Sequence, residues 1–156
     1  MKKNHLFLMI PLVFMLSNLA IAQSDPEKLF IDHADKCLET MKQTAEKLSV
    51  VGVAVVAYMP GEQSTTWISK MMVAGALANE SANFLSIVYS KMGEMADTHM
   101  ISGTAGREPL VGEFGWQGGV IKKIGSGYLL AAFSGGSGEQ DAEIATKGLV
   151  QLSGFF

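Results

Sequence analysis

The sequence has 156 residues, enough for one domain with a hydrophobic core and too few for two domains of ordinary size. Its 48% hydrophobic and 17% charged residues exclude an intrinsically disordered chain. The 12 basic and 15 acidic residues give a net charge of −3, which argues against nucleic acid or another polyanion as a partner.

The N-terminus has the three parts of a secretory signal peptide. A basic start with Lys2 and Lys3 precedes an apolar run over residues 6–16, and Ala20-Ile21-Ala22 supplies the small residues of a cleavage site. The apolar run is shorter than the ~20 residues that a membrane-spanning helix needs. We therefore expect residues 1–22 to be removed, leaving an exported protein, periplasmic or secreted, without a stable membrane anchor.

Cleavage at that point leaves a mature chain, residues 23–156, whose charge is 10 − 15 = −5 because the two N-terminal lysines are lost. The chain has a single cysteine, Cys37, and therefore forms no intramolecular disulfide. Its stability has to come from a packed core rather than from covalent cross-links.

The first half of the mature chain predicts helix, two strands and helix. A capping box of Ser24 and Glu27 opens a long amphipathic helix that continues to about Ser49. The apolar, β-branched run over residues 50–59 indicates a central strand buried on both faces, and a second strand follows from Ser64 toward residue 76. Apolar residues at helical spacing from Phe84, with His99 as a possible last member, predict a second amphipathic helix.

The second half is rich in glycine: 11 of the 17 glycines fall within residues 103–138. Residues 119–123 and 128–133 have the composition of two strands of a hairpin. Ser137 and Gln140 form a capping box before a last helix over residues 139–152. Together the elements predict one α+β domain of order α-β-β-α-β-β-α, with helices packed on an antiparallel sheet of four to five strands.

Residues 131–141 (AAFSGGSGEQD), with Ala145 and Gly148 in the helix behind them, resemble the C-terminal signature of the GlcG/HbpS-like haem-binding family. That family also includes the C-terminal domain of PduO-type corrinoid adenosyltransferases. The resemblance implies haem or another tetrapyrrole as the ligand, and homo-oligomers as the assembly.

Haem iron takes His, Met, Cys or Tyr as axial ligands. His33 is the best single candidate for an axial or metal ligand, and Cys37 one turn later could join it in chelating a metal. The alternative is that Cys37 belongs to the core and His33 to its boundary. His99 is a second candidate, although a helix C-terminus favours histidine by its dipole alone. Met92, Met95 and Tyr58 are conceivable ligands that core packing explains equally well.

Lys91 projects close to the apolar stripe of its helix, so its ammonium either reaches solvent or meets a partner such as a propionate, a substrate carboxylate or an acidic residue of a neighbouring subunit. The glycine-rich loop before the last helix is a candidate anion seat, with a tight, well-capped turn as the alternative. The candidate cofactor-binding residues are His33, Lys91, His99, Ser134, Gly135, Gly136 and Ser137.

The predicted signal peptide and the resemblance to the haem-binding family together favour an exported protein that sequesters, senses or delivers haem. Two alternatives stay open: an enzyme of haem degradation or small-metabolite conversion, and an oligomeric small-ligand module without haem. No catalytic residue is assigned, because the sequence holds no nucleophile elbow, no zinc-protease motif and no EF-hand loop.

Overall fold

The computed structural model describes residues 25–63 and 65–156, so the predicted signal peptide and Ser24 lie outside the described residues. The elements are α1 (Pro26–Lys47), β1 (Gly52–Met59), β2 (Ile68–Ala74), α2 (Phe84–Thr98), β3 (Gly119–Ile124), β4 (Gly127–Ser134) and α3 (Gly138–Ser153). The predicted fold class and element order are confirmed. Within the described residues, no helix combines the length and apolar character needed to cross a membrane.

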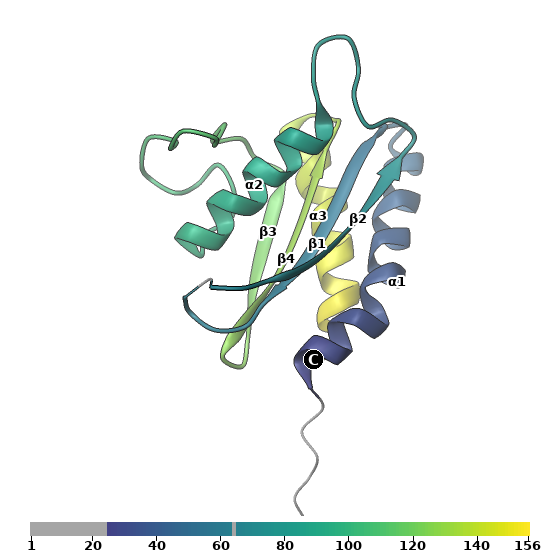
Figure 1. Cartoon of the computed structure of the whole chain (residues 1–156). Coiled ribbons are helices and arrows are strands. Elements are labelled where there is room, and N and C mark those ends of the chain that lie inside the picture. Colours follow the sequence, from purple (N-terminus) through teal and green to yellow (C-terminus); the bar gives the residue numbers. More distant parts are fainter. Residues whose placement is uncertain (1–24, 64) are drawn as a thin grey trace, which may run out of the picture.

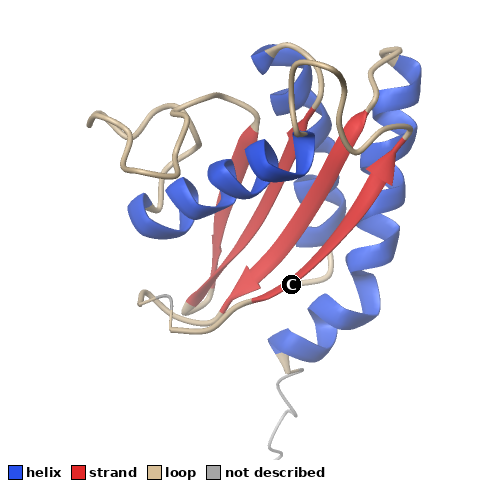
Figure 2. Ribbon diagram, turned by 45° about the horizontal axis from the view of Figure 1, so that its top comes forward, coloured by secondary structure: helices blue, strands red, loops and turns tan. Residues whose placement is uncertain are grey.

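The four strands form one antiparallel sheet in the order β2-β1-β4-β3, with β2 and β3 at its edges. Helices α1 and α3 pack against one face and α2 crosses the other (Figure 1; Figure 2). All eight residues of β1 are buried, as predicted for a central strand. Its side chains alternate between the two cores, with Val53 and Val55 toward α2 and Ala54 and Val56 toward α1 and α3.

Helix α1 begins one residue later than the predicted capping box implies. Asp25 is the N-cap, and its carboxylate accepts the backbone N–H of Glu27 at 3.0 Å, while Pro26 occupies the first turn. The capping box at α3 is confirmed: Ser137 and Gln140 each accept the other's backbone N–H, at 3.3 Å and 3.0 Å. Local hydrogen bonding of this kind fixes where α3 starts and therefore where the preceding glycine loop ends.

The second strand starts at Ile68, four residues after the predicted Ser64. Ser64 itself lies outside the described residues. Ile68 pairs with Tyr58 near the end of β1, so residues 65–67 have almost no strand left to pair with. A strand exists only where a neighbour supplies hydrogen bonds, which composition alone does not show.

Helix α1 packs on α3 through Cys37, which is fully buried and donates its thiol hydrogen to the carbonyl oxygen of Gly148 at 3.0 Å. Burial raises the pKa of the Cys37 thiol to about 12. Cys37 is thus a core residue, in keeping with one of the two alternatives considered from the sequence.

We expect a thiol reagent such as DTNB at pH 8 to label the native protein at least about 100-fold more slowly than the urea-unfolded chain, because the reactive thiolate is suppressed and shielded. Rates measured by absorbance in the two states provide the comparison. Equal rates would mean that Cys37 is accessible and would contradict its place between α1 and α3.

Candidate functional site

The largest concentration of predicted site residues lies where β4 ends and the glycine loop leads into α3. A pocket of about 460 Å³ opens there between the first half of α2, the glycine loop and the segment just before β3. Its lining includes Lys91, Ser134, Gly135 and Gly136, four of the residues singled out in the sequence.

The lining of this pocket, hereafter the Lys91 pocket, includes a buried ion pair. The Lys91 Nζ donates to Asp141 Oδ2 and to the carbonyl oxygen of Phe133, both at 2.8 Å. The two charged side chains are 2% and 5% exposed. Burial lowers the pKa of Lys91 and raises the pKa of Asp141, while their mutual attraction opposes both shifts. Lys91 therefore has an internal acidic partner.

Sequence reasoning did not single out Asp141 as the partner of Lys91. The remaining oxygen of its carboxylate, Oδ1, accepts the backbone N–H of Gly136 at 2.8 Å. The N–H of Ser137 is taken by the Gln140 side chain in the capping box. The N–H groups of Gly136 and Ser137 in the predicted anion seat are thus used within the chain, and the anion at the start of α3 is Asp141.

Two hydrogen-bond donors remain for a ligand. An ammonium carries three N–H bonds, and only two of those on Lys91 have partners in the described residues. Ser134 is buried, lies on the α2 face of β4 because its neighbour Phe133 faces the opposite core, and lines the pocket. Within the described ranges its hydroxyl makes no hydrogen bond. Both groups are placed by regular elements, Lys91 by α2 and Ser134 by β4.

The walls of the Lys91 pocket are apolar on the side opposite the glycine loop. Phe84 and Ile87 come from the first turns of α2, and Trp116 comes from the long loop before β3. Trp116 is half exposed and stacks on Phe114 with ring centroids 4.9 Å apart. Glu139 also lines the pocket and adds one negative charge beside the neutral Lys91–Asp141 pair, so the charged side chains of the lining are negative in sum.

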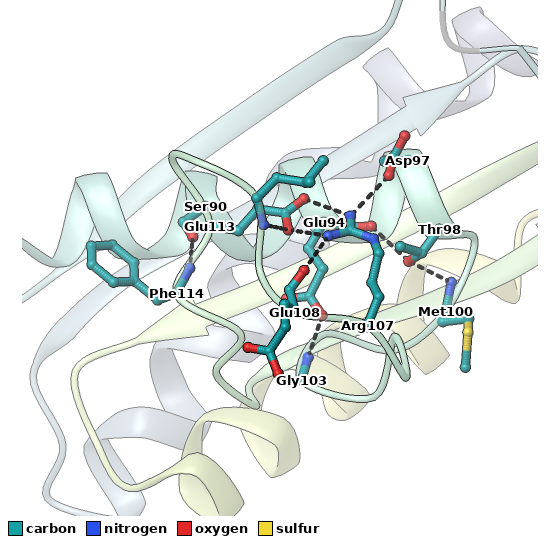
Figure 3. Close-up of polar contacts among 11 residues, drawn as sticks. Ser90, Glu94, Asp97, Thr98, Met100, Gly103, Arg107, Glu108, Glu113 and Phe114 are labelled. Atoms are coloured by element: carbon teal, nitrogen blue, oxygen red, sulfur yellow. Dashed lines mark hydrogen bonds and ion pairs between the residues drawn. The ribbon is translucent and has the colours of Figure 1, made fainter.

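A polar network fastens the loop that carries Trp116 to α2 (Figure 3). Arg107 donates to both carboxylate oxygens of Glu113, at 2.8 Å and 2.9 Å, and to Asp97 at 2.9 Å. The backbone N–H of Phe114 donates to the Ser90 hydroxyl at 2.9 Å. Sequence reasoning did not single out Arg107, which in the structure helps fix the loop that forms one wall of the pocket.

His33 lies on the other side of the sheet, on α1. Its ring is half-buried and stacks face to face on Phe155, with centroids 3.7 Å apart and planes within 4°. Its neighbour in the predicted metal pair, Cys37, faces the core. Among the described residues no group of three or more His, Cys, Asp or Glu side chains is placed to hold a metal ion. The structure therefore separates His33 from the Lys91 pocket.

His99 is the left-handed C-cap of α2, eight residues beyond Lys91 and therefore about 12 Å farther along the helix axis. Its ring stacks on Tyr128 at 4.5 Å, and its Nδ1 lies 3.9 Å from a carboxylate oxygen of Glu62. Its Nε2 is buried without a hydrogen-bond partner in the part of the chain that the structure describes. His99 thus belongs to a second polar cluster, apart from the pocket.

Met92, Met95 and Tyr58 are core residues. Both methionines are fully buried under α2, and Tyr58 packs in the core between the sheet and the other two helices. The predicted candidates are therefore spread over the Lys91 pocket, the His33 stack, the His99 cluster and the two cores.

Solved structures match the fold, among them the following two. One is the crystal structure of the Klebsiella pneumoniae protein ORFY, assigned to the family model DUF336, with a TM-score of 0.55, 16% identity and coverage of 79% of this chain and 89% of that one. The other is a PduOC:heme complex, with a TM-score of 0.54, 16% identity and coverage of 77% and 91%. The chain has the fold of these proteins. No protein-family model and no curated protein matched the sequence.

Proposed function

We propose that the chain is an exported haem-binding protein that sequesters, senses or delivers haem, with the Lys91 pocket as the binding site. The observation that carries the proposal is one pocket lined by Lys91 and Ser134, each with a donor that has no partner in the described residues, and by the apolar side chains of Phe84, Ile87 and Trp116. An apolar, aromatic ring system that bears carboxylates complements this arrangement. A structural neighbour described as a haem complex supports haem as the first candidate.

The organic part of haem and its iron fit the pocket differently. Its propionate carboxylates match the two donors, and its macrocycle matches the apolar walls. Its iron finds no partner, because none of the residues that line the pocket is His, Cys, Met or Tyr. The lining thus offers apolar side chains for the ring and hydrogen-bond donors for a carboxylate but no axial ligand, and we derive no step that involves the iron.

A haemin titration of the purified mature protein tests the proposal. We expect a saturable change in the Soret band with a stoichiometry of one haemin per chain. Boiled protein and an unrelated protein of similar size control for non-specific adsorption of haemin. A change that rises linearly with haemin, or one that the boiled protein reproduces, would contradict the proposal.

Export is part of the same proposal and rests on the predicted cleavage after Ala22. Intact-mass analysis of the protein recovered from the periplasm or medium should show a chain that starts at Gln23. A full-length chain found only in the cytoplasm would overturn this part.

We further propose that the protein is a homo-oligomer, with the exposed Phe114–Trp116 stack as part of the contact between subunits. Light scattering coupled to size-exclusion chromatography measures the mass. A monomer at all concentrations would contradict the proposal.

A further inference from the structure

We infer that the Lys91 pocket recognises a porphyrin through a carboxylate and the ring face, so that metal-free protoporphyrin binds as tightly as haemin. The inference rests on the proposed function and specifies how the pocket would hold its ligand. It starts from the mismatch between the lining of the pocket and the needs of haem iron.

The pocket offers two hydrogen-bond donors, the Lys91 ammonium and the Ser134 hydroxyl. Lys91 on α2 and Ser134 at the end of β4 both line the pocket. Because Asp141 and the Phe133 carbonyl hold the Lys91 ammonium in place at 2.8 Å, its third N–H has a fixed direction before any ligand arrives. A donor held in position in this way loses little freedom when it binds a carboxylate oxygen.

Asp141 lies beside the Lys91 ammonium, and its own carboxylate could repel a ligand carboxylate. Its charge is already balanced by Lys91, and its other oxygen accepts the N–H of Gly136. The positive end of the α3 dipole lies at the same place, since Asp141 is in the first turn of that helix. Asp141 is therefore compensated locally, and the acidic side chain of the lining that a ligand carboxylate still meets is Glu139.

The histidines and methionines considered as iron ligands lie outside the pocket. The imidazole of His33 is stacked on Phe155 across the sheet, and the Nε2 of His99 is buried beside Tyr128 about two turns farther along α2. Met92 and Met95 are fully buried in the core. None of these groups lines the pocket, so a porphyrin bound there gains nothing from carrying iron.

The test compares haemin, metal-free protoporphyrin IX and protoporphyrin IX dimethyl ester on the full mature protein, by equilibrium titration of porphyrin absorbance or emission. We expect the dissociation constants of haemin and metal-free protoporphyrin to agree within about threefold. The dimethyl ester should bind at least about tenfold more weakly, because esterification removes the negative charge of the carboxylates that the pocket is inferred to recognise.

Variants locate the site. Ser134→Ala should weaken haemin and metal-free protoporphyrin equally, by about three- to tenfold, and Ser126→Ala in the exposed β3–β4 turn is the matched control. His33→Ala and His99→Ala should leave both affinities unchanged. Ser134→Ala is preferred over Lys91 variants because it leaves the buried ion pair intact.

Two results would overturn the inference. In the first, metal-free protoporphyrin binds more than 100-fold more weakly than haemin, and a histidine variant loses the haemin Soret shift. This result would place the iron on that histidine and leave the proposed function standing. Binding of neither porphyrin would overturn the proposed function together with the inference.

Discussion

Replacing Asp141 with Ala should lower the free energy of unfolding by about 3–5 kcal/mol, measured by urea denaturation. The variant leaves the Lys91 ammonium 2% exposed beside a carbonyl oxygen and without a counter-charge. It also removes the acceptor of the Gly136 N–H. A buried charge without a partner is among the few point defects with an effect of this size.

The double-mutant cycle with Lys91→Met and Asp141→Asn separates the pair from its surroundings. Both single variants should be strongly destabilised, and the double variant should lose less than the sum, because no uncompensated charge remains and Asn keeps an acceptor for Gly136. The surface pair Lys28–Asp32, in which both side chains are largely exposed, is the control and should show a coupling of at most about 1 kcal/mol. Additive losses at Lys91 and Asp141 would show that the two charges do not interact.

Gly52→Ala should cost about 3 kcal/mol or more. A Cβ atom on Gly52 would overlap the backbone carbonyl oxygen of Ser134 and lie 2.9 Å from the ring of Phe133. Because the closest neighbour is backbone in the paired strand β4, it cannot turn away as a flexible side chain would. The overlap between the added Cβ and the Ser134 carbonyl oxygen is relieved only if β1 and β4 separate at the edge of the Lys91 pocket.

Gly93→Ala is the matched control, and its expected effect has the opposite sign. Gly93 lies inside α2, is exposed, and a Cβ there meets nothing within 4 Å. The variant should be more stable by about 0.5–1 kcal/mol, because alanine loses less backbone entropy in a helix. Two Gly→Ala changes with opposite signs in urea denaturation would support the packing described here, and equal effects would contradict it.

Most of the fold follows from local patterns. The apolar run of β1, the helical spacing after Phe84 and the capping box at Ser137 each determine an element without reference to the rest of the chain. The start of β2 at Ile68 depends instead on how far its partner β1 extends. Several nearby residues could serve as the N-cap of α1, and the backbone geometry determines that it is Asp25. Such features arise from pairing and conformation rather than from composition.

The site was less predictable. Lys91 could be recognised because a cation close to an apolar stripe needs a partner, and the glycine loop because of its composition. Asp141 could not be assigned to Lys91, since the two lie 50 residues apart and meet only where α2 and α3 approach the end of β4. The separation of His33 from Lys91 likewise depends on α1 and α2 lying on opposite faces of the sheet.

The most direct test of the Lys91 pocket as the binding site is chemical-shift mapping by NMR with gallium protoporphyrin, a diamagnetic analogue of haem. We predict that the largest shifts fall on the amides of Gly135 and Gly136 and on the indole N–H of Trp116, with the His33 and Phe155 signals unchanged. Shifts centred on His33 and Phe155, with the signals of the pocket unmoved, would contradict this account.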